Sequence, residues 1–130
     1  MVPSRFSLPV MFLALLIISC GSNSSKVVKK GDFVILEEDM RERAETQWAE
    51  SYTDGFTIEL PKGTRLEVLY TPAPAAQVFE CRPVEINGIK DPEEVEKFFV
   101  PDFIRNKDGY LSYVVALKKE LLGSSIKKVQ

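Results

Sequence analysis

The side chains that proteins most often use for catalysis near neutral pH are scarce in this sequence. Its 130 residues include no histidine and only two cysteines, Cys20 and Cys81. The lack of histidine excludes Ser-His-Asp and Cys-His arrangements and every His-containing zinc site. As a nucleophile, Cys81 would need a group that lowers its pKa, and the adjacent Arg82 would point to the opposite face of a strand. We therefore expect Cys81 to be a buried structural thiol.

Two clusters of acidic residues are the remaining candidates for acid–base chemistry. A glycosidase needs two carboxylates about 5–9 Å apart across a cleft, which neighbours in sequence do not establish. A calcium loop needs acids at alternating positions, and Asn106–Gly109 holds only a fragment of one. We expect no metal, no cofactor and no enzyme, and keep a hydrolase that uses carboxylates alone as a remote alternative. The clusters are Glu37, Glu38 and Asp39, and Asp91, Glu93 and Glu94.

The start of the chain has the layout of a secretory signal. Arg5 is the one charged residue before an apolar run that ends at Ser19, and this run is shorter than the about 20 residues that span a bilayer. It leads into Ile17-Ile18-Ser19-Cys20-Gly21, which resembles the lipobox of bacterial lipoproteins. The resemblance implies that Ile17, Ile18 and Ser19 form the recognition box and that Cys20 becomes the acylated N-terminus. The alternative is a plain signal peptide cut elsewhere, or an uncleaved short anchor.

This resemblance sets the expected domain organisation. Residues 1–19 would be the signal peptide, 20–30 a lipidated tether, 31–123 a single small domain and 124–130 a tail. Two or more acyl chains on Cys20 would hold the protein firmly to a membrane. Lysines of the tether would lie near anionic headgroups or simply be solvated. The expected location is the bacterial cell envelope, at the outer membrane or the periplasmic face of the inner membrane, with the extracellular face also compatible.

Length and charge narrow the classes of partner. Removal of residues 1–19 leaves 111 residues, enough for one domain with a core. Of the 17 basic residues only Arg5 is lost, so the remaining chain has 16 basic and 19 acidic residues and a net charge of −3. Nucleic-acid binding needs a concentrated basic face, so we expect no nucleic-acid partner.

The first half of the mature chain predicts three strands and leaves one segment open. Gly31–Glu37 is a compact apolar run with β-branched residues, typical of a strand. In residues 39–53 apolar residues recur at every fourth and also at every second position, so a helix and a strand both fit. The Thr and aromatic residues there favour the strand. Gly55–Leu60 and Arg65–Tyr70 both alternate, and the turn between them predicts a hairpin.

The second half adds a helix and further strands. Val78–Ile86 predicts a strand in which Pro83 places a bulge or an edge, followed by a turn at Asn87-Gly88. Asp91-Pro92 is a helix start, and the apolar face of that helix would comprise Val95, Phe98 and Phe99. Phe103-Ile104 and Tyr110–Leu117 flank a second predicted hairpin turn. A helical turn from Lys118 to Leu122 closes the domain at Gly123.

These elements predict a mainly β fold, a small antiparallel barrel or roll with one short inserted helix. The order of strand, long arm, turn at Lys62-Gly63-Thr64 with Val68 following, and closing Tyr113–Leu117 strand resembles SH3-like barrels. The resemblance covers roughly residues 31–122. The insertion at residues 87–105 departs from the simplest pattern of that family, which leaves the closure of the barrel open.

The aromatic residues Trp48, Tyr52 and Phe56 are the candidates for a binding groove. They would line the space between the long arm and the barrel, where SH3-like domains bind extended peptides. The alternative is that these rings fill the core, the commoner fate of aromatic side chains. The groove hypothesis predicts that Trp48 is partly exposed and that its N–H is reachable from solvent.

The leading hypothesis is a lipid-anchored, non-catalytic interaction module of the cell envelope. Its partners would be the membrane, through lipid on Cys20, and another envelope protein or cell-wall material. The alternative is a structural or surface lipoprotein without a defined ligand pocket.

Overall fold

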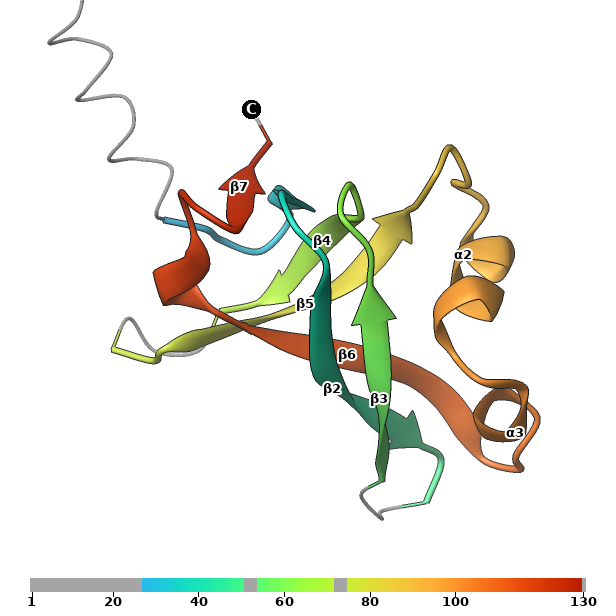
Figure 1. Cartoon of the computed structure of the whole chain (residues 1–130). Coiled ribbons are helices and arrows are strands. Elements are labelled where there is room, and N and C mark those ends of the chain that lie inside the picture. Colours follow the sequence, from blue (N-terminus) through green and yellow to red (C-terminus); the bar gives the residue numbers. More distant parts are fainter. Residues whose placement is uncertain (1–26, 51–53, 72–74, 130) are drawn as a thin grey trace, which may run out of the picture.

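The computed structural model describes residues 27–50, 54–71 and 75–129, and in these ranges the chain folds into one antiparallel sheet with a short helical insertion (Figure 1). The elements are β1 (Phe33–Leu36), β2 (Met40–Trp48), β3 (Gly55–Leu60), β4 (Arg65–Tyr70), β5 (Val78–Glu85), α2 (Pro92–Phe99), α3 (Asp102–Arg105), β6 (Tyr110–Lys118), a 3-10 turn (Lys119–Leu121) and β7 (Ile126–Lys128). The order of the strands in the sheet is β3-β2-β6-β5-β4-β1-β7, and every ladder between them is antiparallel. The mainly β, small antiparallel fold is therefore confirmed.

The core lies inside the curve of this sheet. Alternate residues of the strands are buried, as the two-residue period of β structure requires, and Phe79, Tyr113 and Leu117 are almost fully enclosed. Cys81 is also fully buried, which confirms its prediction as a structural thiol, and burial raises its pKa far above the ordinary value of a thiol. The strands β3 and β7 stand at the two ends of the described sheet and are not paired with each other, so the described residues form an open roll.

The segment predicted as a strand at residues 39–53 is β2 from Met40 to Trp48, but the predicted hairpin of the next two strands is wrong. Strand β3 pairs with β2, whereas β4 pairs with β1 and β5. The turn between them is held by the end of β1: Leu36 N–H donates to the Thr64 carbonyl at 3.0 Å, and Gly63 N–H donates to the Leu36 carbonyl at 2.9 Å. Alternation predicts that a segment is a strand, but it does not specify the neighbour of that strand.

Both ends of the domain reach further than predicted. Val28, placed in the tether, packs into the core with 8% of its surface exposed, and Gly31 N–H donates to the Val68 carbonyl. Residues 126–128, placed in a tail, form β7 beside β1, and Ile126 is fully buried. A three-residue strand with one apolar side chain gives almost no periodic signal, which explains the error.

The insertion between β5 and β6 begins as predicted. The Asp91 carboxylate accepts a hydrogen bond from Glu94 N–H at 3.2 Å, and Pro92 opens α2. Of the predicted apolar face, Val95 and Phe99 are buried, but Phe98 is 48% exposed. The predicted strand at Phe103-Ile104 is wrong, because these residues lie in the single helical turn α3.

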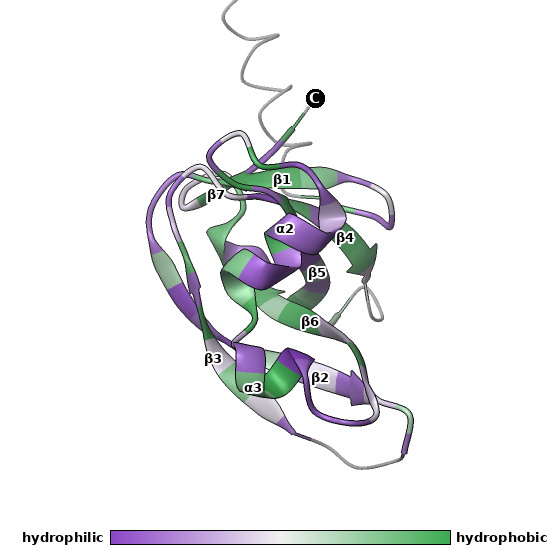
Figure 2. Ribbon diagram, turned by 90° about the vertical axis from the view of Figure 1, so that its right-hand side faces the viewer, coloured by the Kyte–Doolittle hydropathy of each residue, from purple (hydrophilic) through white to green (hydrophobic). Residues whose placement is uncertain are grey.

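The helical insertion lies on the side of the sheet away from β7 and from the start of the described chain (Figure 1). After a quarter turn, α2 faces the viewer and shows mainly hydrophilic residues (Figure 2). Among the described helices, none is long and apolar enough to cross a membrane.

Candidate binding site

Strands β5 and β6 separate where Pro83 interrupts their ladder. The pairing runs from Val78↔Lys118 to Cys81↔Val115, and continuing that register would set Pro83 opposite Tyr113. Proline has no N–H to donate, so the ladder cannot continue. The Tyr113 carbonyl instead accepts a hydrogen bond from Arg82 Nε at 2.8 Å. The Arg82 side chain thus replaces the missing backbone donor, and the strands diverge beyond it.

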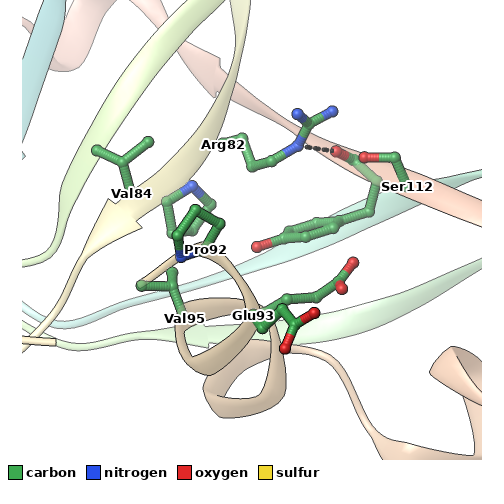
Figure 3. Close-up of a pocket in the computed structure, with 9 residues that line it drawn as sticks. Arg82, Val84, Pro92, Glu93, Val95 and Ser112 are labelled. Carbon is green, nitrogen blue, oxygen red and sulfur yellow. Dashed lines mark hydrogen bonds between the residues drawn. The ribbon is translucent and has the colours of Figure 1, made fainter. Parts of the chain in front are cut away.

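A recess of about 320 Å³ opens between the diverging strands and α2. In the close-up, Arg82 and Ser112 lie on one side and Glu93 on the other, while Pro92, Val95 and Val84 form an apolar wall (Figure 3). A hollow of this size, mostly apolar with a few polar groups, is typical of small-ligand sites. Its lining residues are Arg82, Pro83, Val84, Pro92, Glu93, Val95, Glu96, Ser112 and Tyr113.

The Tyr113 hydroxyl borders the recess. Only 1% of Tyr113 is exposed, and its hydroxyl makes no hydrogen bond within the part of the chain that the structure describes. Burial raises the pKa of this tyrosine, the nearby Arg82 lowers it, and Glu96 raises it further, with a net upward shift. The hydroxyl is therefore neutral at physiological pH and able to donate or accept a hydrogen bond.

The opposite wall carries two carboxylates. Tyr110 Oη donates a hydrogen bond of 2.7 Å to Glu96 Oε1, which orients that carboxylate, and burial together with this bond raises the pKa of Tyr110. The Glu93 side chain makes no hydrogen bond or ion pair with any described residue. With Arg82 as the one cation of the lining, the recess has a net charge of −1.

A second hollow of about 400 Å³ adjoins the recess, because Glu93 and Glu96 line both. Leu111, at its edge, is 64% exposed. Phe98 and Phe103, 48% and 74% exposed, belong to the same insertion. Thus three of the five large apolar side chains that stand exposed among the described residues lie between residues 98 and 111. Of these three, Leu111 lines the hollow, and an exposed apolar side chain at the edge of a pocket is typical of interaction sites.

The predicted aromatic groove does not coincide with this recess. Trp48 and Phe56 are buried, with 8% and 7% of their surfaces exposed, and the Trp48 Nε1 atom is screened from solvent. Trp48 packs edge-on against Tyr110 with 5.8 Å between ring centres, and Phe56 lies 5.9 Å from Tyr113. The expectation of a partly exposed Trp48 is therefore wrong. Tyr52, Cys20 and the lipobox residues Ile17, Ile18 and Ser19 lie outside the described residues.

The burial of Trp48 follows the alternation of β2, in which Ala44, Thr46 and Trp48 share the buried face. The register of β2 against β6 shifts between Gln47 and Trp48, where β6 contributes the extra residue Leu111, so that Trp48 faces Tyr110. Trp48 and Phe56 thereby pack against two tyrosines, Tyr110 and Tyr113, that also reach the two hollows.

The acidic clusters do not form a metal site within the described ranges, where no three potential ligands of a metal ion converge. Of the recess residues, the sequence marked Glu93 only as part of a helix start. It gave no sign of Arg82, Glu96 or Tyr113 as site residues. The usable signal was Pro83 inside a strand, since a proline that ends a ladder leaves a gap beside it.

No protein-family model, curated protein or solved structure matches this chain.

Proposed function

We propose that this protein is a lipid-anchored lipoprotein of the bacterial cell envelope whose domain is a non-catalytic binding module. Lipid on Cys20 holds it to the membrane. The recess between α2 and the divergent ends of β5 and β6 binds another component of the envelope, a protein or cell-wall material.

The polar groups that border the recess carry this proposal. The Tyr113 hydroxyl and the exposed Glu93 carboxylate both line it, and neither has a hydrogen-bond partner among the described residues. A mostly apolar hollow with a few unused polar groups is typical of a ligand site. A ligand that supplied hydrogen bonds to both groups would use them.

The orientation of the domain supports the same function. The described chain starts beside β7, and the insertion that borders the recess lies on the other side of the sheet (Figure 1). A tether that begins at Cys20 would therefore attach near β7. The recess and the exposed Leu111 are left free to meet a partner.

Photocrosslinking in living cells tests this function. A benzophenone amino acid replaces Leu111 beside the recess in the full-length protein, and in a matched control it replaces Lys62, which is exposed in the turn between β3 and β4. We expect a discrete crosslinked product from position 111 and none from position 62. The absence of a product at 111, or equal products from both positions, would contradict a binding site at the recess.

A further inference from the structure

We propose that the recess binds a lysine-type side chain, an aliphatic stem that ends in an ammonium group, presented by an extended segment of a partner protein. This inference rests on the binding function proposed above and narrows its ligand to one chemical class.

The walls of the recess match the stem of such a side chain. Pro83, Val84, Pro92 and Val95 provide apolar surface from both β5 and α2. Lysine buries its methylene groups against surfaces of this kind and keeps its charged head among polar groups. A volume of about 320 Å³ lies near the lower end of the range for ligand pockets, which suits one side chain with its adjoining backbone.

The polar groups of the recess match the ammonium head. An ammonium group has three donors and no acceptor, so it needs acceptors around it. Glu93, Glu96 and the Tyr113 hydroxyl provide them, and Glu96 is already oriented by its hydrogen bond from Tyr110. All three groups line the same recess, from α2 on one side and β6 on the other.

The balance of charge disfavours an anionic ligand. Two carboxylates against one guanidinium leave the recess with a net negative charge, so an anionic group would meet repulsion. Arg82 is also committed to the fold, because its Nε donates to the Tyr113 carbonyl and its guanidinium carbon lies 5.7 Å from the centre of the Tyr113 ring. Its structural role is to hold Tyr113 in place.

The test uses three capped tripeptides that differ only in the central side chain, namely lysine, the uncharged isostere norleucine, and glutamate. Each is titrated into the isotopically labelled full-length lipoprotein in detergent micelles, and binding is followed by the amide signals of Val95, Ser112 and Tyr113. We expect the lysine peptide to shift these signals at least about tenfold more tightly than the norleucine peptide, because a hydrogen-bonded ion pair is lost with the charge. The glutamate peptide should leave them unchanged.

Variants that each remove one negative charge identify the carboxylates that contact the ammonium group. Glu93→Gln and Glu96→Gln should each weaken lysine-peptide binding by about tenfold, and the amide introduced at position 96 can still accept the hydrogen bond from Tyr110. The matched control is Glu94→Gln on the same helix. Glu94 pairs with Lys97 at 3.5 Å and does not line the recess, so this variant should bind as the wild type does.

The outcomes separate this inference from the function on which it rests. Equal binding of the lysine and norleucine peptides, preference for glutamate, or no signal shift in the recess would overturn the lysine assignment. A specific crosslink from position 111 would still support a binding module with another ligand. Loss of binding in Glu94→Gln equal to that in Glu93→Gln would show a general charge effect and also overturn the assignment.

Discussion

The β1–β7 end of the domain and the recess differ in whether their polar groups are paired within the protein. Beside β7, Lys127 Nζ lies 3.9 Å from Glu37 Oε1, and Lys128 Nζ lies 3.5 Å from Asp32 Oδ2. Beside α2, neither the exposed Glu93 carboxylate nor the Tyr113 hydroxyl has a hydrogen-bond partner among the described residues. At the β1–β7 end the charged groups therefore pair within the fold, whereas at the recess polar groups remain available to a ligand.

The difference follows from how each strand edge is completed. At the first end, Glu37 N–H donates to the Ser125 carbonyl and Val129 N–H donates to the Phe33 carbonyl, so the backbone donors of both segments are used in pairing. At the recess, Pro83 stops the ladder between β5 and β6, and a side chain replaces the missing bond. In this sheet the recess opens where a backbone donor is absent.

The replacement Cys20→Ala should have the largest effect of all, because it tests whether the β1–β7 end of the domain is the end attached to the membrane. It should abolish lipid attachment and leave unprocessed precursor, because the lipobox-like segment offers no other thiol. Labelling of cells with a palmitate analogue measures this. Cys81→Ala is the matched control and should keep full labelling. Undiminished label in Cys20→Ala would mean that the β7 side is not the anchored end.

The replacement Trp48→Ala tests the packing beneath the recess. Since Trp48 is buried against Tyr110, its loss should lower the free energy of unfolding by about 3–5 kcal/mol. Leu111→Ala, at an exposed position, should change it by less than about 0.5 kcal/mol. Denaturant unfolding followed by circular dichroism compares the two variants. A small loss for Trp48→Ala would restore the groove hypothesis.

The replacement Ile126→Ala tests whether the C-terminal segment belongs to the fold. Ile126 is fully buried in β7, so the change should cost about 2–4 kcal/mol of stability, as measured by the same unfolding experiment. Lys127→Ala removes one exposed ion pair in the same strand and should cost no more than about 1 kcal/mol. Equal and small effects would show that residues 124–130 behave as a tail in solution.

Alkaline pH should weaken the fold through the tyrosines beside the recess. The pKa values of Tyr110 and Tyr113 are raised in the folded state, so unfolded chains lose these protons first as the pH passes about 10. The folded state then holds more protons than the unfolded state, and stability falls as the pH rises further. Unfolding free energies measured from about pH 8 to about pH 11.5 should show this fall, and Tyr113→Phe should make it shallower. An unchanged slope in that variant would contradict the burial of Tyr113.

The sequence predicted local structure well where one residue type has one strong preference. Alternation located the strands, and Asp91 with Pro92 located the start of α2. Two errors concern partners, since the neighbour of β4 and the pairing of β7 depend on contacts between distant segments. The error at Trp48 concerns which face of β2 meets the core, and Trp48 shares that face with Ala44. The recess was missed because its defining bond joins Arg82 to a carbonyl 31 residues further along the chain.

Tyr113→Phe, the variant with the smallest expected effect on stability, is the sharpest test of the recess as a binding site. At neutral pH, Tyr113→Phe should change the free energy of unfolding by less than about 0.5 kcal/mol, because the hydroxyl that it removes has no partner among the described residues. Tyr110→Phe is the matched control, since it removes a hydroxyl that donates to a carboxylate, and it should cost about 1 kcal/mol. Denaturant unfolding of both variants measures the two changes in stability. Titration with the lysine peptide then measures whether Tyr113→Phe weakens binding. Binding should weaken in Tyr113→Phe although stability is preserved, because the lost group serves the ligand and not the fold. A cost above about 1 kcal/mol for Tyr113→Phe would instead make this hydroxyl a structural group and the recess an ordinary part of the core.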